Sequence, residues 1–195
     1  MRKYSGKVGF LLAIVLIMAL IVGCSKGPID NPEPPAEDNI GEGGENIVVD
    51  PEPEGETITV KLYYVNEEYV LTGEDSLDRI IPVEREITIG EKSVESIVLS
   101  KLQEKPSEQD LSTALDNIKI LSVDTAEKIA YVNISGEKLS GGSLQESLVL
   151  QQIVYSLTEL EGVEAVQILV DGSKRETLMG HIFIEEPLER PDMGY

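Results

Sequence analysis

Few residues of this 195-residue chain have the types and spacing that a catalytic site requires. His181 is the only histidine, which excludes any site that needs two, including most zinc sites. A serine triad needs one histidine, but neither Ser140 nor Ser173 has the glycine-rich setting of a nucleophile elbow. Ser135 and Lys138 match the S-x-x-K spacing of penicillin-recognising enzymes, although the companion S-D-N and K-T-G motifs are missing. We therefore expect a protein that is not an enzyme.

The start of the chain has the parts of a bacterial secretory signal. Arg2, Lys3 and Lys7 precede an apolar run over residues 8–22. That run is shorter than the roughly 20 residues that span a bilayer comfortably. It predicts a cleaved signal peptide over residues 1–23, with an uncleaved membrane anchor as the alternative.

The only cysteine, Cys24, follows this run directly, in the sequence Ile21-Val22-Gly23-Cys24. The ending resembles the lipobox of bacterial lipoproteins, in which the cysteine is acylated and becomes the first residue of the mature protein. Two or more acyl chains hold a protein on a membrane stably. We therefore expect Cys24 to carry lipid and to tether the chain to the extracytoplasmic face of the cell membrane.

The charge and composition of the chain limit the classes of partner that it can bind. The chain has 36 acidic and 16 basic residues, a net charge of −20, with no tryptophan and two phenylalanines. Such a charge repels phosphate backbones, and aromatic platforms for bases are scarce, so nucleic acid is excluded as a partner. With Cys24 lipidated, no disulfide, reactive thiolate or cysteine metal site remains. We expect no metal and no cofactor.

Composition and periodicity predict the domain organisation. Residues 24–56 form an acidic, proline-rich stretch, which predicts a disordered linker after the acylated cysteine. Residues 57–188 have the length of one domain, and residues 189–195 are left as a tail. Hydrophobic patterns within the domain predict strands at 57–65, 69–71, 79–88, 118–123, 129–134 and 163–170. They also predict two helices: one begins at a capping box formed by Thr88 and Glu91 and ends before Pro106, and the other runs from Leu144 to near Gly162.

This order predicts an α/β (α+β) fold: one small domain with a mixed sheet and two helices packed on one side. Pro82 would place its strand at an edge of the sheet. The apolar strand at 163–170 should lie in the middle, and residues 124–128 should form a hairpin turn. From Glu91 onward, the order of elements is helix, strand, strand, helix, strand.

The second predicted helix carries more apolar surface than one contact needs. Beyond its core face, Leu144, Leu148 and Tyr155 form a second ridge. Two interpretations remain open: the ridge packs against the first helix, or it is an interface with another protein.

Several segments together resemble the GerMN domain of bacterial sporulation and spore germination proteins. The resemblance runs from Val60 to Leu188 and is carried by Leu121-Ser122-Val123, Val132 to Ser135, Gln151 to Glu159, Gly162 to Gly172 and Gly180-His181. It implies a secreted or lipid-anchored protein with no established catalytic residues. The element order is also similar to the ring-building motif of secretion and sporulation channel proteins, which implies a homo-oligomer as one expectation.

The resemblance and the lipobox together predict a protein-interaction domain at the membrane, with envelope or sporulation proteins as partners. The alternative is a binding module for a small ligand or a cell-wall fragment, for which Asp171, Gly180 and His181 at the end of the sheet are the candidate residues. A cell-wall hydrolase is the third and weakest interpretation.

Overall fold

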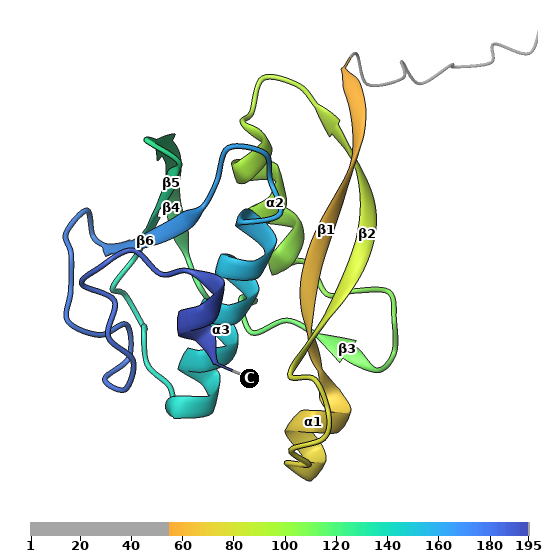
Figure 1. Ribbon diagram of the computed structural model, residues 1–195, viewed down its shortest axis with the longest axis vertical. Helices are drawn as coiled ribbons and strands as arrows, with labels where there is room; N and C mark the ends of the chain where they lie inside the picture. Colours follow the sequence, from red (N-terminus) through yellow and green to blue (C-terminus); the bar gives the residue numbers. More distant parts are fainter. Residues whose placement is uncertain (1–54, 195) are drawn as a thin grey trace, which may run out of the picture. The chain divides into compact units, whose positions relative to one another are not determined.

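The computed structural model describes residues 55–194, which include the whole predicted domain (Figure 1). The predicted signal peptide, Cys24 and nearly all of the predicted linker lie outside the described residues. The elements are β1 (Glu56–Asn66), α1 (Glu67–Thr72), β2 (Ile80–Ile89), α2 (Val94–Gln103), β3 (Leu111–Ser112), β4 (Ile120–Ala126), β5 (Ile129–Ile134), α3 (Ser143–Leu157), β6 (Ala165–Val170) and a 3-10 helix at Arg190–Met193.

The strands form two sheets of three strands each. In the first, β1 lies between β2 and β3 and pairs antiparallel with both. In the second, β5 pairs antiparallel with β4 and parallel with β6. The α/β class of a small domain is confirmed, but the single mixed sheet is wrong, because β1 and β2 form a sheet with β3 and do not pair with β4, β5 or β6.

Helices α2 and α3 contact each other and join the two sheets. Helix α3 contacts β1 and β6, and α2 contacts β1 and β4, as their positions between the sheets suggest (Figure 1). The predicted core face of α3 is fully buried at Val149, Leu150, Ile153, Val154 and Leu157. The core is therefore built around α3, and the helices do not simply cover one side of one sheet. Within residues 55–194, no helix has both the length and the apolarity to cross a bilayer.

Strand β6 lies at the edge of its ladder and not in its middle. Its outer side is covered by the chain that follows: Val166 and Leu188 exchange backbone hydrogen bonds of 2.9 and 2.8 Å. The side-chain amide of Gln167 also donates to the Ile184 carbonyl at 2.9 Å. The strand is thus buried, as its apolar sequence predicts, by a covering segment in place of another strand.

The short strand predicted at residues 69–71 is wrong, because these residues belong to helix α1. The Asn66 side chain accepts a hydrogen bond from Glu68 N at 3.0 Å, which satisfies one of the free N–H groups of the first turn. Gly73 ends the helix in the left-handed region, at φ 67°. Caps at both ends outweigh the β-propensity of three residues.

Helix α2 begins later than the predicted capping box. Its N-cap is Ser93, whose hydroxyl accepts from Ser96 N at 3.2 Å. Thr88 instead pairs with Thr57 in the β1–β2 ladder, so it cannot start a helix. Strand β2 is an edge strand, as Pro82 predicted.

The C-terminal residues belong to the folded unit. The 3-10 helix contacts α3, and Met193 is buried. The buried Gln151 amide donates to the carbonyls of Met193 and Gly194, at 2.9 and 3.3 Å. The segment predicted as a tail therefore packs over the hydrophobic core, as far as Gly194, the last described residue.

Candidate functional site

Gly180 and His181, two of the predicted ligand residues, lie in a loop that is held by Glu146 of α3. The Glu146 side chain is fully buried. Its Oε1 accepts from the backbone N–H groups of Leu178 and Met179, at 3.0 and 2.8 Å. Its Oε2 accepts from His181 N at 2.9 Å and lies 3.0 Å from His181 Nδ1. Gly180, at φ 107°, lets the loop turn back to the carboxylate.

The carboxylate–imidazole pair is the orienting half of a serine triad, but no hydroxyl completes it. Among the described residues, no serine hydrogen-bonds to the His181 ring, and Ser173 pairs instead with Val170 in a turn. Glu146 binds three backbone N–H groups, so it organises the loop. The His181 side chain remains 42% exposed, in a position to contact a ligand at the surface.

Asp171, the third predicted ligand residue, belongs to a different set of contacts. It begins a tight turn after β6, at φ 51°, and its Oδ1 accepts from Gly136 N at 3.0 Å. Gly172 N donates to the Asn133 side chain at 2.8 Å. Over residues 55–194, no hydrogen bond or ion pair joins Asp171 to His181, so the three predicted residues do not form one bonded cluster.

The S-x-x-K sequence is placed in the connection between β5 and α3. Ser135 Oγ accepts from Glu137 N at 3.2 Å, and Lys138 is exposed at φ 60°. The serine is therefore not at the start of a helix, as penicillin-recognising chemistry requires. The described residues also contain no group of three or more metal-ligating side chains.

The predicted interface ridge on α3 is not an exposed surface. Leu144 is 40% exposed, but Leu148 and Tyr155 are buried, at 4% and 7%. The Tyr155 ring packs edge-on against Tyr63, with 5.2 Å between ring centroids, and Arg190 lies 5.0 Å from its centroid. Of the two open interpretations, an interface at Leu148 and Tyr155 is wrong, because both side chains are buried, and Tyr63 of β1 and Arg190 of the C-terminal segment cover Tyr155.

A charged cluster fastens the C-terminal segment to the end of α3. Arg190 Nη2 lies 2.6 Å from Glu159 Oε1, and its Nε donates to Thr158 Oγ1 at 2.7 Å. The guanidinium also lies 5.5 Å from the Tyr63 ring centroid. Burial raises the pKa of Glu159, but the hydrogen bonds from Arg190 and Tyr63 outweigh it and hold that pKa below its ordinary value.

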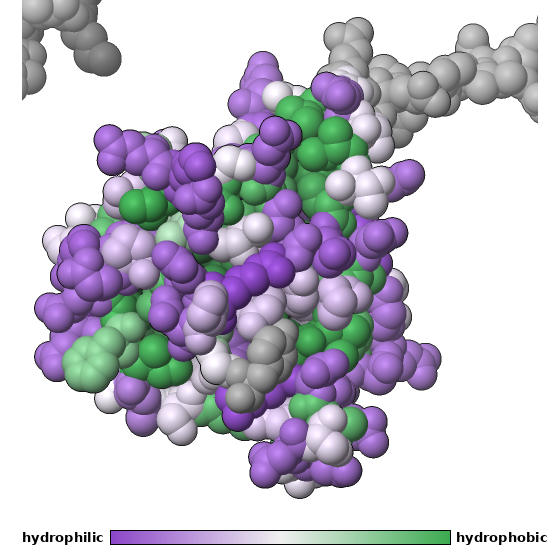
Figure 2. Space-filling view, in the orientation of Figure 1, coloured by the Kyte–Doolittle hydropathy of each residue, from purple (hydrophilic) through white to green (hydrophobic). Residues whose placement is uncertain are grey.

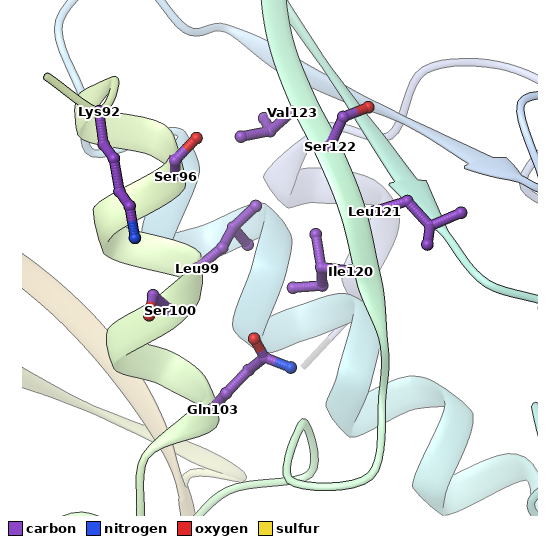
Figure 3. A pocket seen from close by; sticks show the side chains of 9 residues that line it. All are labelled: Lys92, Ser96, Leu99, Ser100, Gln103, Ile120, Leu121, Ser122 and Val123. Atoms are coloured by element: carbon purple, nitrogen blue, oxygen red, sulfur yellow. The ribbon is translucent and has the colours of Figure 1, made fainter. Parts of the chain in front are cut away.

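An open groove of about 330 Å³ lies between α2 and β4 (Figure 3). Leu99 of α2 and Ile120 of β4 face each other across it, and Leu121 points away from it (Figure 3). Two hydrogen bonds join its walls: Thr125 Oγ1 to Glu95 Oε1 at 2.8 Å, and Gln103 Nε2 to the Ile118 carbonyl at 2.5 Å. The lining residues are Lys92, Ser96, Leu99, Ser100, Gln103, Ile120, Leu121, Ser122 and Val123.

Elsewhere, polar residues cover most of the face seen in Figure 2, with apolar residues in separate groups among them.

The sequence analysis predicted neither Glu146 nor the groove. A signal for Glu146 existed: it stands three and four residues before Val149 and Leu150, on the core face of a predicted helix, where an unpaired carboxylate is costly.

Comparison with known proteins identifies the family. The family model described as "Germane: Sporulation and spore germination" matches residues 61–176, more than half of the chain. This chain belongs to the Germane family. The predicted GerMN resemblance is thereby confirmed, and no curated protein sequence matches the chain.

Two solved GerMN structures show the same fold. The Germane domain is similar to the first GerMN domain of the sporulation protein GerM from Bacillus subtilis, with a TM-score of 0.56 and 17% identity over 69% of this chain and 98% of that one. It matches the tandem GerMN domains of GerM with a TM-score of 0.55 and 23% identity, over 76% of this chain and 49% of that one. The match thus spans about half of the tandem protein. A Clostridium perfringens protein described as a lipoprotein matches with a TM-score of 0.48 and 24% identity, over 70% and 89%.

Proposed function

We propose that this chain is a lipid-anchored protein on the extracytoplasmic face of the cell membrane, and that its Germane domain binds proteins of the envelope or of the sporulation machinery. The family description connects the domain with sporulation and germination. The signal-like start and the Ile-Val-Gly-Cys sequence support the lipid anchor. The domain works by recognition and not by catalysis.

The observation that carries the choice of binding over catalysis is the state of Glu146. This carboxylate is the group bonded to the only histidine, and it accepts hydrogen bonds from three backbone N–H groups at 2.8–3.0 Å. In a serine triad such a carboxylate only orients the histidine, and a serine hydroxyl must reach the imidazole; among the described residues, no serine hydrogen-bonds to the His181 ring. The chemistry of Glu146 is therefore used to hold the 178–181 loop.

The test is crosslinking of the intact lipoprotein in its own envelope, followed by mass spectrometry of the adducts. We expect one or a few envelope or sporulation proteins, captured reproducibly and lost when an excess of unlabelled domain competes. A chain that forms no such adducts, or that is recovered without lipid in the culture fluid, would contradict the proposal.

Binding of a small ligand or cell-wall fragment is the second candidate function. It is favoured by the His181 ring, which is fixed through Nδ1 by Glu146 and still 42% exposed. A muropeptide that binds the parent chain and not the His181→Ala variant would support it. Turnover of muropeptides by the purified chain would instead favour the third interpretation, a cell-wall hydrolase.

A further inference from the structure

Strand β4 has a free edge, unlike the other edge strands of comparable length. Strand β2 is interrupted by Pro82, which has no N–H to donate. Strand β6 is covered by residues 184–188 through the bonds of Val166 and Gln167. Strand β4 is the last strand of its sheet and contains no proline. An uncovered edge of this kind can pair with another chain.

The hairpin register shows which backbone groups of β4 point outward. Glu127 and Lys128 form a two-residue turn with φ of 51° and 66°, and Ala126 pairs with Ile129 across it. The pair that flanks such a turn is hydrogen-bonded, and the pattern alternates along the ladder. Val123 and Thr125 therefore direct their N–H and C=O groups away from β5. Within the described part of the chain, no strand pairs with this side of β4.

A bulge at Leu121 shapes the groove beside this edge. The register shifts between Ile120 and Ser122, so Ile120 and Val123, three residues apart, both pack against the core. Together with Leu99 they give the groove an apolar floor next to the outward-facing backbone groups. The floor suits an aliphatic side chain of an extended peptide.

Charge complementarity indicates the chemistry of the occupant. Lys92 is the one basic residue that lines the groove, in a chain with more than twice as many acidic as basic residues, and the nearby Glu95 carboxylate accepts the hydroxyl of Thr125. The Lys92 side chain runs along α2 in the direction of Ser100 (Figure 3). A bound segment with a carboxylate at this end would meet a positive charge, whereas most of the protein surface would repel it.

We propose that the α2–β4 groove binds an extended segment of another protein, which adds as a fourth strand to the β4 edge. The segment hydrogen-bonds to the backbones of Val123 and Thr125, places an aliphatic side chain over Leu99 and Ile120, and directs an acidic side chain to Lys92. This mode of recognition takes affinity from backbone hydrogen bonds and specificity from alternate side chains. The inference rests on the proposed function and names the kind of partner and where it binds.

The test uses the full-length chain in detergent and a fluorescent peptide, Glu-Val-Thr-Val-Thr-Val with both ends blocked, measured by fluorescence anisotropy. The control peptide has the same side chains and alternate backbone N-methyl groups, which remove hydrogen-bond donors. We expect the parent peptide to bind about tenfold more tightly than the control, the equivalent of about 1.4 kcal/mol. Equal affinities, or no binding of the parent peptide up to about 1 mM, would overturn the proposal.

Two substitutions at Thr125 distinguish the contribution of its backbone N–H to peptide binding from that of its side chain. Thr125→Pro removes an outward N–H without removing a bond to β5, and we expect it to weaken peptide binding about tenfold. Thr125→Ala loses the hydrogen bond to Glu95 but keeps the N–H, and should bind within about threefold of the parent chain. Equal binding by the two variants would count against strand addition.

Reversal of the charge at Lys92 tests the orientation of the bound peptide without changing a residue of β4. Lys92→Glu should bind the parent peptide about fivefold more weakly and prefer a peptide that begins with Lys. An unchanged preference would refute the placement of the acidic end. If the chain instead forms a dimer that Thr125→Pro dissociates, the occupant is a second copy and the proposed partner is wrong. Envelope crosslinks that persist in Thr125→Pro would overturn this inference while leaving the proposed function intact.

Discussion

Replacement of Glu146 by glutamine tests whether this carboxylate organises the 178–181 loop. The glutamine oxygen can still accept from Leu178 N and Met179 N, but without the negative charge. Its NH2 group faces His181 N–H, so two donors meet where a hydrogen bond of 2.9 Å had been. The side chain is fully buried, so water cannot readily replace the lost acceptor.

The expected loss follows from these contacts. A hydrogen bond to a charged group contributes about 1.5–3 kcal/mol, and a buried donor left without an acceptor costs about 1–3 kcal/mol. One lost bond and two weakened ones, offset by burying a neutral group in place of a charge, give a loss of roughly 3 kcal/mol. At about 2–4 °C per kcal/mol, the Tm should fall by roughly 6–12 °C.

The assay is thermal unfolding of the full-length chain, followed by circular dichroism, with hydrogen exchange to locate the effect. Glu137→Gln is the matched control, because Glu137 is exposed and should change stability by less than about 0.5 kcal/mol. The amides of residues 178–181 should exchange faster in Glu146→Gln than in the parent chain, and their exchange rates should be unchanged in the control. If both variants melt within about 2 °C of the parent chain, Glu146 does not support the loop as argued.

Three further predictions concern the C-terminal cluster, the lipid anchor and the only histidine. Arg190→Ala should cost roughly 2–3 kcal/mol in urea unfolding at pH 7. The pKa of Glu159 is lowered in the folded state. The Glu159 carboxylate therefore contributes fully to folding stability above its ordinary pKa of about 4.3, and this contribution is lost as the pH falls through its pKa in the folded state. The stability cost of Arg190→Ala should accordingly shrink near pH 3. Cys24→Ser should abolish incorporation of labelled palmitate and release the chain from membranes, and a chain that is still labelled would show acylation elsewhere. His181→Ala should keep the envelope crosslinks and lose no more than about 1.5 kcal/mol, because Glu146 keeps its three backbone donors.

The sequence predicted the elements whose signals are long and periodic. The hairpin of β4 and β5, the core face of α3 and the apolar strand β6 all appear in the structure. Each of these elements is at least six residues long, and tertiary contacts reinforce its local preference. The three-residue apolar run at Tyr69 lacked that length, and the caps at Asn66 and Gly73 made it helical.

Pairing between distant segments could not be read from periodicity. The pattern of Thr57 to Val65 predicts a strand but does not say that it pairs with β2 and β3 in a separate sheet. The cover on Tyr155 comes partly from Arg190, in a segment too short to show a period. For the same reason, the free edge of β4 emerges only once the neighbours of every strand are known.

The most direct test of a lipid-anchored protein-binding domain is site-specific photo-crosslinking of the acylated full-length chain in its native envelope. A photoreactive residue replaces Ser100 in the α2–β4 groove, and the control replaces the exposed Ser76 in the β1–β2 connection. The account predicts a discrete protein adduct from position 100 in the membrane fraction, absent from position 76 and from Thr125→Pro. Equal, diffuse labelling from both positions would contradict it.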